Sequence, residues 1–171
     1  MLRSGRLVIV AILVLGVAAG AFAVWYQQQQ SRQALRFWGT EGASLIARAP
    51  HVEAVWLELA GKQAADCDDS LEVPGGTACV RQRQDVDRTP GISNLRRALM
   101  QDATFQWSAE PPEGADWEFA LRFFDEGQST VLLFDLARGA CAEASTSRSV
   151  VLDPAATKDL SDFFAEQFGG E

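Results

Sequence analysis

The 171-residue chain has only one histidine, His51, and three cysteines. These counts leave little room for catalytic dyads that use histidine, or for zinc sites with the usual four ligands. The sequence also lacks a phosphate-cradling glycine loop, a nucleophile elbow and a metal-binding pair of histidines. We therefore expect no cofactor and no metal, and the sequence favours a protein that is not an enzyme.

Basic residues are also few, since 15 lysines and arginines stand against 23 acidic residues and the net charge is −8. Binding to nucleic acid or to anionic lipid headgroups requires clustered basic side chains that pair with phosphates. We therefore expect no nucleic acid as a partner. The apolar fraction of 47% is close to the average for globular proteins, which argues against a disordered chain.

An uninterrupted apolar run lies near the start of the chain. Residues 7–26 carry no charge, and a helix of that length spans about 30 Å, the thickness of the hydrocarbon core of a bilayer. The run ends with Trp25 and Tyr26, whose amphipathic rings are typical of the membrane–water interface. The sequence therefore predicts a transmembrane helix over residues 7–26, with the lipid bilayer as its partner.

Two interpretations of this helix stay open. Ala21-Phe22-Ala23 fits the pattern of a signal-peptidase site, and cleavage after Ala23 would release a secreted, periplasmic protein. The run is longer than the apolar region of a signal peptide, which favours a retained anchor. Because residues 1–6 with their two arginines tend to stay in the cytoplasm, we expect a single-pass inner-membrane protein with a cytoplasmic N-terminus and a periplasmic C-terminal domain.

The rest of the chain alternates between helical and period-2 apolar patterns. Residues 27–36 are expected to be a juxtamembrane linker or helix, and residues 37–171 a single extracytoplasmic domain. The expected elements are a helix over 31–49 weakened at Gly39 and Gly42, a strand over 51–59, a hairpin between 66 and 83, a helix that begins with Thr89 as its cap, strands over 117–124, 130–136, 140–144 and 149–152, and a last helix capped by Asp153. Short links between consecutive strands favour antiparallel pairing, so we predict an α+β fold in which two or three helices cover an antiparallel sheet.

Cys67 and Cys79 flank a Pro-Gly-Gly turn. In an oxidising compartment they would join the ends of this hairpin, with a stabilisation of about 3 kcal/mol in the chain-entropy model. Three cysteines allow three single pairings, so the disulfide between Cys67 and Cys79 is a prediction that spacing alone does not settle. Cys141 falls on a predicted strand, where we expect it to be a small buried side chain.

Two hypotheses for the function involve binding. In the first, the acidic domain is a non-catalytic module that interacts with another envelope protein, because it has a tether and a compact fold but no catalytic constellation. In the second, Trp56, Trp107 and Trp117 line a groove for a small apolar ligand. Trp117 is also expected to share one face of its strand with Phe119, because alternate strand residues point to the same side.

A third hypothesis is a carboxylate-dependent hydrolase that uses Asp85, Asp87 or Asp125. Two converging carboxylates can perform acid–base chemistry, but the hypothesis fails if these residues lie on separate solvent-facing loops. His51 follows Pro50 at a predicted corner between a helix and a strand, and we expect it to face solvent.

Three stretches carry a resemblance to known proteins. Residues 36–39 (Arg-Phe-Trp-Gly), 91–99 and 117–123 resemble segments of uncharacterised, small membrane-anchored proteins of planctomycete-type bacteria. The resemblance extends over most of the domain and implies no activity, substrate or site. What it implies is a location in a bacterial envelope.

Overall fold

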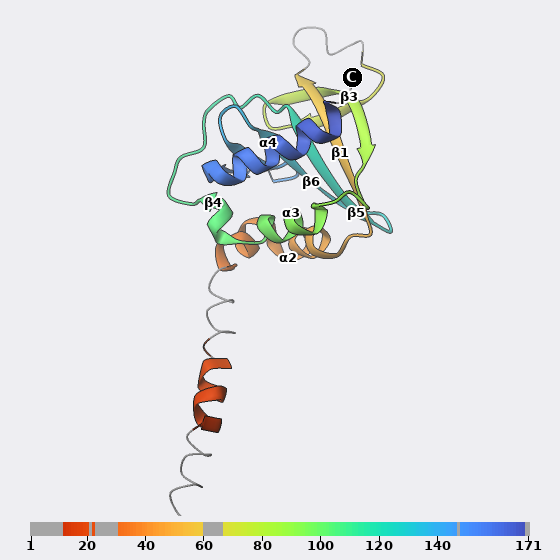
Figure 1. Cartoon of the computed structure of the whole chain (residues 1–171). Coiled ribbons are helices and arrows are strands. Elements are labelled where there is room, and N and C mark those ends of the chain that lie inside the picture. The colour runs from red at the N-terminus through yellow and green to blue at the C-terminus, as the bar shows by residue number, and fades with distance from the viewer. Residues whose placement is uncertain (1–11, 21, 23–30, 60–66, 147, 170–171) are drawn as a thin grey trace, which may run out of the picture.

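The structure, a computed structural model, describes residues 12–20, 22, 31–59, 67–146 and 148–169. Residues 12–20 and 22 are helical and lie apart from the remaining elements, which form one α+β domain (Figure 1). Within the described ranges, no helix combines the length and the apolar character needed to cross a membrane. The remainder of the predicted span over 7–26 lies outside the described residues, as do residues 1–6 and 27–30.

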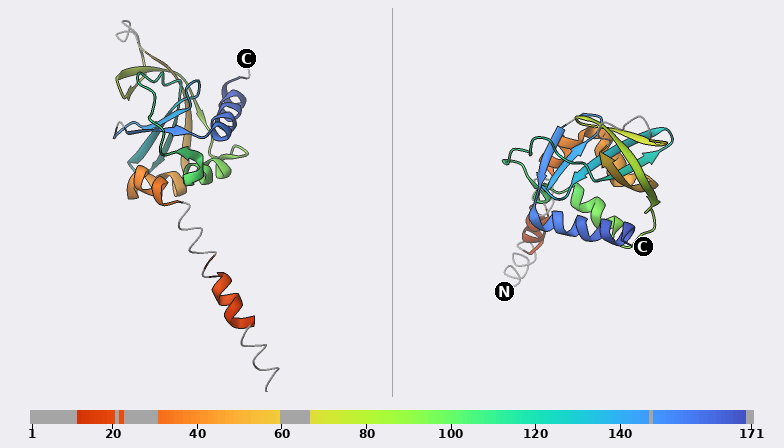
Figure 2. Two further views of the ribbon diagram at one scale, coloured as in Figure 1. Left: turned by 90° about the vertical axis from the view of Figure 1, so that its left-hand side faces the viewer. Right: turned by 90° about the horizontal axis from the view of Figure 1, so that it is seen from above.

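Four elements besides the strands build the domain, and they cover one side of the sheet. They are the helices α2 (Arg32–Arg48), α3 (Ile92–Leu99) and α4 (Pro154–Phe168) and the short 3-10 helix η2 (Asp102–Thr104). Side chains of α2, α3 and α4 belong to one apolar cluster, together with side chains from one face of the sheet. Seen from above, α3 and α4 lie side by side on one side of the sheet (Figure 2).

All strands are antiparallel and form one sheet in the order β2-β3-β1-β5-β6-β7-β8-β4. The strands are β1 (His51–Leu59), β2 (Ser70–Val73), β3 (Gly76–Asp85), β4 (Phe105–Gln106), β5 (Phe119–Asp125), β6 (Gln128–Asp135), β7 (Ala140–Glu143) and β8 (Arg148–Leu152). Strands β5 to β8 keep their chain order in the sheet, because each is joined to the next by a short turn. The predicted α+β class, with an antiparallel sheet covered by helices, is confirmed.

Helix α2 includes residues 32–36, part of the segment predicted as a juxtamembrane linker or helix, and it bends sharply at Gly39. Gly39 has φ 69° and ψ 176°, a conformation that glycine adopts without strain and that a Cβ atom disfavours. The expected weak point in this helix is therefore where the chain turns.

The start of α2 is held by the chain that follows α3. One carboxylate oxygen of Asp102, Oδ1, accepts the backbone N–H groups of Gln33 (2.9 Å) and Ala34 (2.8 Å). The indole Nε1–H of Trp38 donates to the backbone oxygen of Leu99 at 2.8 Å. Because the first N–H groups of a helix have no partner within the helix, Asp102 acts as an N-terminal cap supplied from elsewhere in the fold.

The two faces of the sheet are both apolar. On the helix side the strand residues in the cluster are Val52, Ala54, Phe105, Leu121, Phe123, Leu132, Phe134, Cys141, Val150 and Leu152. The other face carries Val55, Leu57, Val73, Ala78, Ala120, Leu133, Ala140 and Ala142, together with Trp117. The prediction that Trp117 shares a face with Phe119 is wrong, because β5 begins only at Phe119 and the strand alternation does not extend back to Trp117.

Helix starts differ in how well the sequence predicted them. The carboxylate of Asp153 accepts the N–H of Ala155 and caps α4, as expected. For α3 the expected cap, Thr89, is wrong: Gly91 occupies that position with φ 93°. The N–H of Ile92 donates to the backbone oxygen of Thr89, so residues 89–92 form a turn whose third residue, Gly91, has the positive φ that glycine adopts readily.

Cys67 and Cys79 form a disulfide at the base of the β2–β3 hairpin, with their Cα atoms 5.6 Å apart. Cys141 is a free cysteine buried in the sheet, and burial raises the pKa of its thiol. Its position and environment make it an inert core side chain.

Candidate functional site

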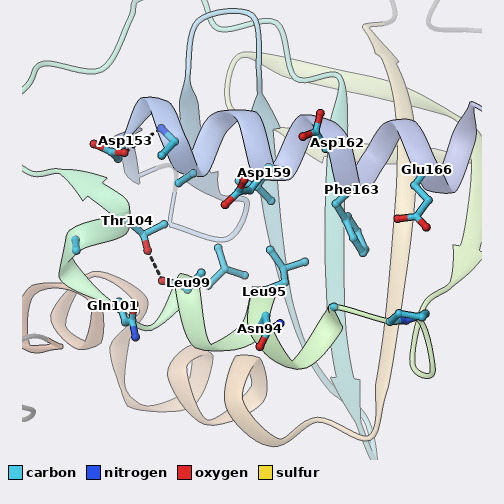
Figure 3. A pocket seen from close by; sticks show the side chains of 17 residues that line it. Asn94, Leu95, Leu99, Gln101, Thr104, Asp153, Asp159, Asp162, Phe163 and Glu166 are labelled. Atoms are coloured by element: carbon cyan, nitrogen blue, oxygen red, sulfur yellow. Dashed lines mark hydrogen bonds between the residues drawn. The ribbon is translucent and has the colours of Figure 1, made fainter.

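A groove of about 550 Å³ lies between α3 and α4, which run in opposite directions (Figure 3). Its volume is within the range of about 300–1,000 Å³ that is typical of ligand sites in proteins. The groove lies on the helix side of the sheet, above the larger apolar cluster. Its floor and its two walls differ in chemistry.

The floor is apolar and comes from the facing sides of the two helices. Leu95 and Leu99 of α3 point toward α4, and Leu160 and Phe163 of α4 line the opposite side. Leu99 and Leu160 are buried, whereas Leu95 and Phe163 are half-buried and extend the core into the groove. Spacings of three and four residues place each pair on one side of its helix.

The α4 wall is acidic. Asp159, Asp162 and Glu166 line the groove at spacings of three and four residues, which places them along one side of the helix. Asp162 pairs with Lys158, whose pKa is raised chiefly by the hydrogen bond to Asp162, with the charge of Asp159 adding to it. Among the described residues, Asp159 and Glu166 form no ion pair, and both are exposed.

The α3 wall is neutral, with the amides of Asn94 and Gln101 along it. Helix α3 carries two arginines, Arg96 and Arg97, and neither lines the groove. Arg96 donates to the backbone oxygens of Ile46 (3.3 Å) and Ala49 (2.7 Å). Arg96 therefore does not compensate the acidic wall.

The side chains along the groove are mostly apolar, amide or acidic. Among the described residues that line the groove there is no histidine or cysteine, and the hydroxyl of Thr104 donates to the backbone oxygen of Ala98. In the part of the chain that the structure describes, no group of three histidine, cysteine or acidic side chains could hold a metal ion. The residues present supply an apolar floor and negative charge.

The three tryptophans of the predicted ligand groove lie at separate places, and none lines the α3–α4 groove. Trp117 is buried in the cluster on the face away from the helices. Trp107 packs against Phe37 at the start of α2. Trp56 is 43% exposed on β1, with its ring centroid 6.2 Å from that of Phe168 at the end of α4. The structure therefore does not bring these rings together.

The three candidate carboxylates lie near one end of the sheet, and two of them, Asp85 and Asp87, make local hydrogen bonds. Asp87 Oδ2 is 3.1 Å from Nδ1 of His51, and its other oxygen accepts the N–H of Val52. Asp85 accepts the N–H of Asp87 at 2.9 Å. Asp125 ends β5 and is exposed. None of these carboxylates lines the groove.

The environment of Asp87 lowers the pKa of its carboxyl group. Burial alone would raise this pKa, but the hydrogen bond from the N–H of Val52, the hydrogen bond and charge of His51 and the charge of Arg96 together outweigh burial. The His51 side chain is 56% exposed, as expected for a residue at a corner, and its ring stacks on Phe124. Sequence analysis missed the pairing of His51 with Asp87.

Compared with known proteins, the chain matches no family model, no curated protein and no solved structure.

Sequence analysis also missed the groove, although one signal for it is present in α4. Acidic residues at 159, 162 and 166 interleave with the apolar residues at 156, 160 and 163. A helix whose buried stripe is bordered by charge of one sign presents a surface suited to a charged partner.

Proposed function

We propose that this protein is a membrane-anchored, non-catalytic interaction module that binds an amphipathic helix of another envelope protein in the α3–α4 groove. The observation that carries this proposal is the groove itself, with its apolar floor between two helices. Amphipathic helices are commonly recognised by apolar grooves of this kind, through anchors at positions i, i+3, i+4 and i+7. A helix laid between α3 and α4 would cover Leu95 and Phe163, which are left half-buried in the isolated domain.

The length of α4 supports a helix as the occupant. Helix α4 has 15 residues, which corresponds to about 22 Å at a rise of about 1.5 Å per residue. The apolar floor residues recur at helical spacing along both walls. A partner helix of about four turns would therefore match the length of the α4 wall.

We further propose that residues 7–26 anchor the protein in the inner membrane, with the N-terminus in the cytoplasm and the domain in the periplasm. The exposed apolar side chains in the described part of this segment support the anchor: Ile12 is 67% and Leu15 75% exposed. Apolar surface of this extent is expected to be covered by lipid. The disulfide supports an oxidising compartment, because disulfides persist there.

Fractionation of cells that produce the full-length chain tests the anchor. We expect the protein to stay with the membranes through high-salt and alkaline washes, and its intact N-terminus to be found by mass spectrometry. A protein that begins at Val24 and is soluble in the periplasm would establish the alternative, cleavage after Ala23. A C-terminal alkaline phosphatase fusion that is inactive would contradict the proposed orientation.

Photo-crosslinking in intact membranes tests the binding function. A photoreactive amino acid at Asn94, on the neutral wall, is expected to give a discrete adduct with a polypeptide whose crosslinked segment is an amphipathic helix. Ala98→Gln, which lengthens a side chain into the groove without removing a core contact, should abolish the adduct. Leu35→Gln on α2, where Leu35 is 44% exposed, is the matched control and should keep it. An adduct insensitive to Ala98→Gln would contradict the proposal.

A small apolar ligand is the second candidate occupant, and the volume of the groove is the observation that favours it. Native mass spectrometry of the purified full-length protein distinguishes the two. A bound small molecule that is lost in Ala98→Gln and retained in Leu35→Gln would favour the small ligand over the helix.

A further inference from the structure

We infer that the helix recognised by the α3–α4 groove carries lysine or arginine along one flank of its apolar side, and that this basic flank lies against α4. The inference rests on the proposed helix-binding function and adds the chemistry of the partner. The observation behind it is that the α4 wall is acidic and the α3 wall is neutral.

The acidic wall lacks a counter-charge of its own. Helix α4 contains the acidic residues Asp159, Asp162 and Glu166 but only one basic residue, Lys158, which is already paired with Asp162. Arg96, on the facing helix, is bound to backbone oxygens of the α2 end. The carboxylates of Asp159 and Glu166 are therefore free to accept from a partner.

A neutral helix in the groove would remove water from these carboxylates without replacing its hydrogen bonds, which is unfavourable. Basic side chains on the flank that faces α4 would supply charge-assisted hydrogen bonds instead. Their long aliphatic stems would also cover the edge of the apolar floor. The α3 wall is lined by the neutral amides of Asn94 and Gln101, so the opposite flank of the partner helix needs no basic residues.

The spacing of the carboxylates sets the spacing of the basic residues. Asp159 and Glu166 are two helical turns apart, which is about 10 Å along the helix axis. A partner helix that lies alongside α4 would meet both carboxylates with basic residues seven positions apart. Because α3 is neutral, only one flank needs them, and this fixes the direction in which the helix enters the groove.

The test uses the full-length protein in phosphatidylcholine nanodiscs and three labelled peptides of about 15 residues, the length of α4. The peptides share one leucine-lined side and carry lysine, glutamine or glutamate on one flank, seven positions apart. Fluorescence anisotropy measures binding, with empty nanodiscs subtracted. We expect the lysine peptide to bind about 3- to 10-fold more tightly than the glutamine peptide, as for two exposed ion pairs, and the glutamate peptide to bind most weakly.

Two variants assign the preference to the wall. The double variant Asp159→Asn with Glu166→Gln should remove the difference between the lysine and glutamine peptides. The matched control, Glu110→Gln with Glu113→Gln on an exposed loop outside the groove, should leave it unchanged. Added salt should reduce the preference in the wild type, because exposed ion pairs are screened.

The outcomes separate this inference from the function on which it rests. Equal binding of the lysine and glutamine peptides, blocked by Ala98→Gln, would overturn the basic flank and leave helix binding intact. A lysine preference that survives the double variant would also overturn it. Failure of all three peptides overturns the basic flank, and joined to the absence of a crosslink at Asn94 it overturns the helix-binding function as well.

Discussion

The N-terminal cap that Asp102 supplies to α2 can be tested by substitution, because its removal should lower the stability of the domain. Replacing Asp102 by alanine removes the acceptor for the N–H groups of Gln33 and Ala34. The helix has no replacement, since Ser31 at its N-cap makes no side-chain hydrogen bond and its first turn has no acidic residue. The two N–H groups would then depend on water.

The expected loss in the free energy of unfolding follows from the values measured when helix caps are removed from other proteins. Removal of a side-chain cap costs about 1–2 kcal/mol in the free energy of unfolding, which for a protein of this size lowers Tm by about 2–8 °C. Asp102→Asn keeps an oxygen acceptor but loses the charge that interacts with the helix dipole, so it should lose only about 0.3–1 kcal/mol. The two substitutions therefore separate the hydrogen bonds from the charge.

Thermal unfolding of the full-length protein in detergent, followed by circular dichroism, measures the overall loss, and hydrogen exchange measures it locally. Backbone amides of Gln33 and Ala34 should exchange faster in Asp102→Ala than in the wild type. Glu110→Ala, at an exposed acidic residue of a loop, is the control and should change neither quantity. Equal losses for the alanine and asparagine variants, or unchanged exchange at the start of α2, would refute the reasoning.

Three further predictions concern the backbone, pH and the disulfide. Gly39→Ala should cost about 1–3 kcal/mol in urea unfolding, because φ 69° with ψ 176° strains any residue with a Cβ atom; a neutral result would show that the bend relaxes. The lowered pKa of Asp87 contributes stability that is present above about pH 4 and is lost as the pH falls through the folded-state value. In Asp87→Asn the free energy of unfolding should therefore fall less steeply below about pH 4 than in the wild type. An equally steep fall in both proteins would contradict this. Reduction of the Cys67–Cys79 disulfide should cost about 3 kcal/mol in the same unfolding assay, and a Cys67→Ser variant that is insensitive to reductant is the control.

Local patterns predicted the elements of this fold well. The alternation in β5 and β6, the Asp153-Pro154 start of α4 and the weak point at Gly39 all depend on residues close together in the chain. Each is decided by backbone preference or by which side of one element is apolar. The antiparallel sheet followed from short connections between consecutive strands.

The features that sequence analysis missed depend on pairing across the chain. His51 meets Asp87 because β1 and β3 pair with Glu53 opposite Asp85, and no local pattern determines that register. The α3–α4 groove likewise requires two helices distant in sequence to lie side by side. The tryptophans show the same limit, since their common aromatic character carried no information about which face of the sheet each would occupy.

The bonds between α2 and the end of α3 have a mechanical consequence. Asp102 accepts hydrogen bonds from the first turn of α2, and the Trp38 indole donates to the backbone oxygen of Leu99. Leu99 also belongs to the floor of the groove. A force applied at the first turn of α2 would therefore reach the α3 wall of the groove through these hydrogen bonds. In the anchored protein that we propose, a force along the membrane helix and a partner in the groove would therefore act on the same helix, α3.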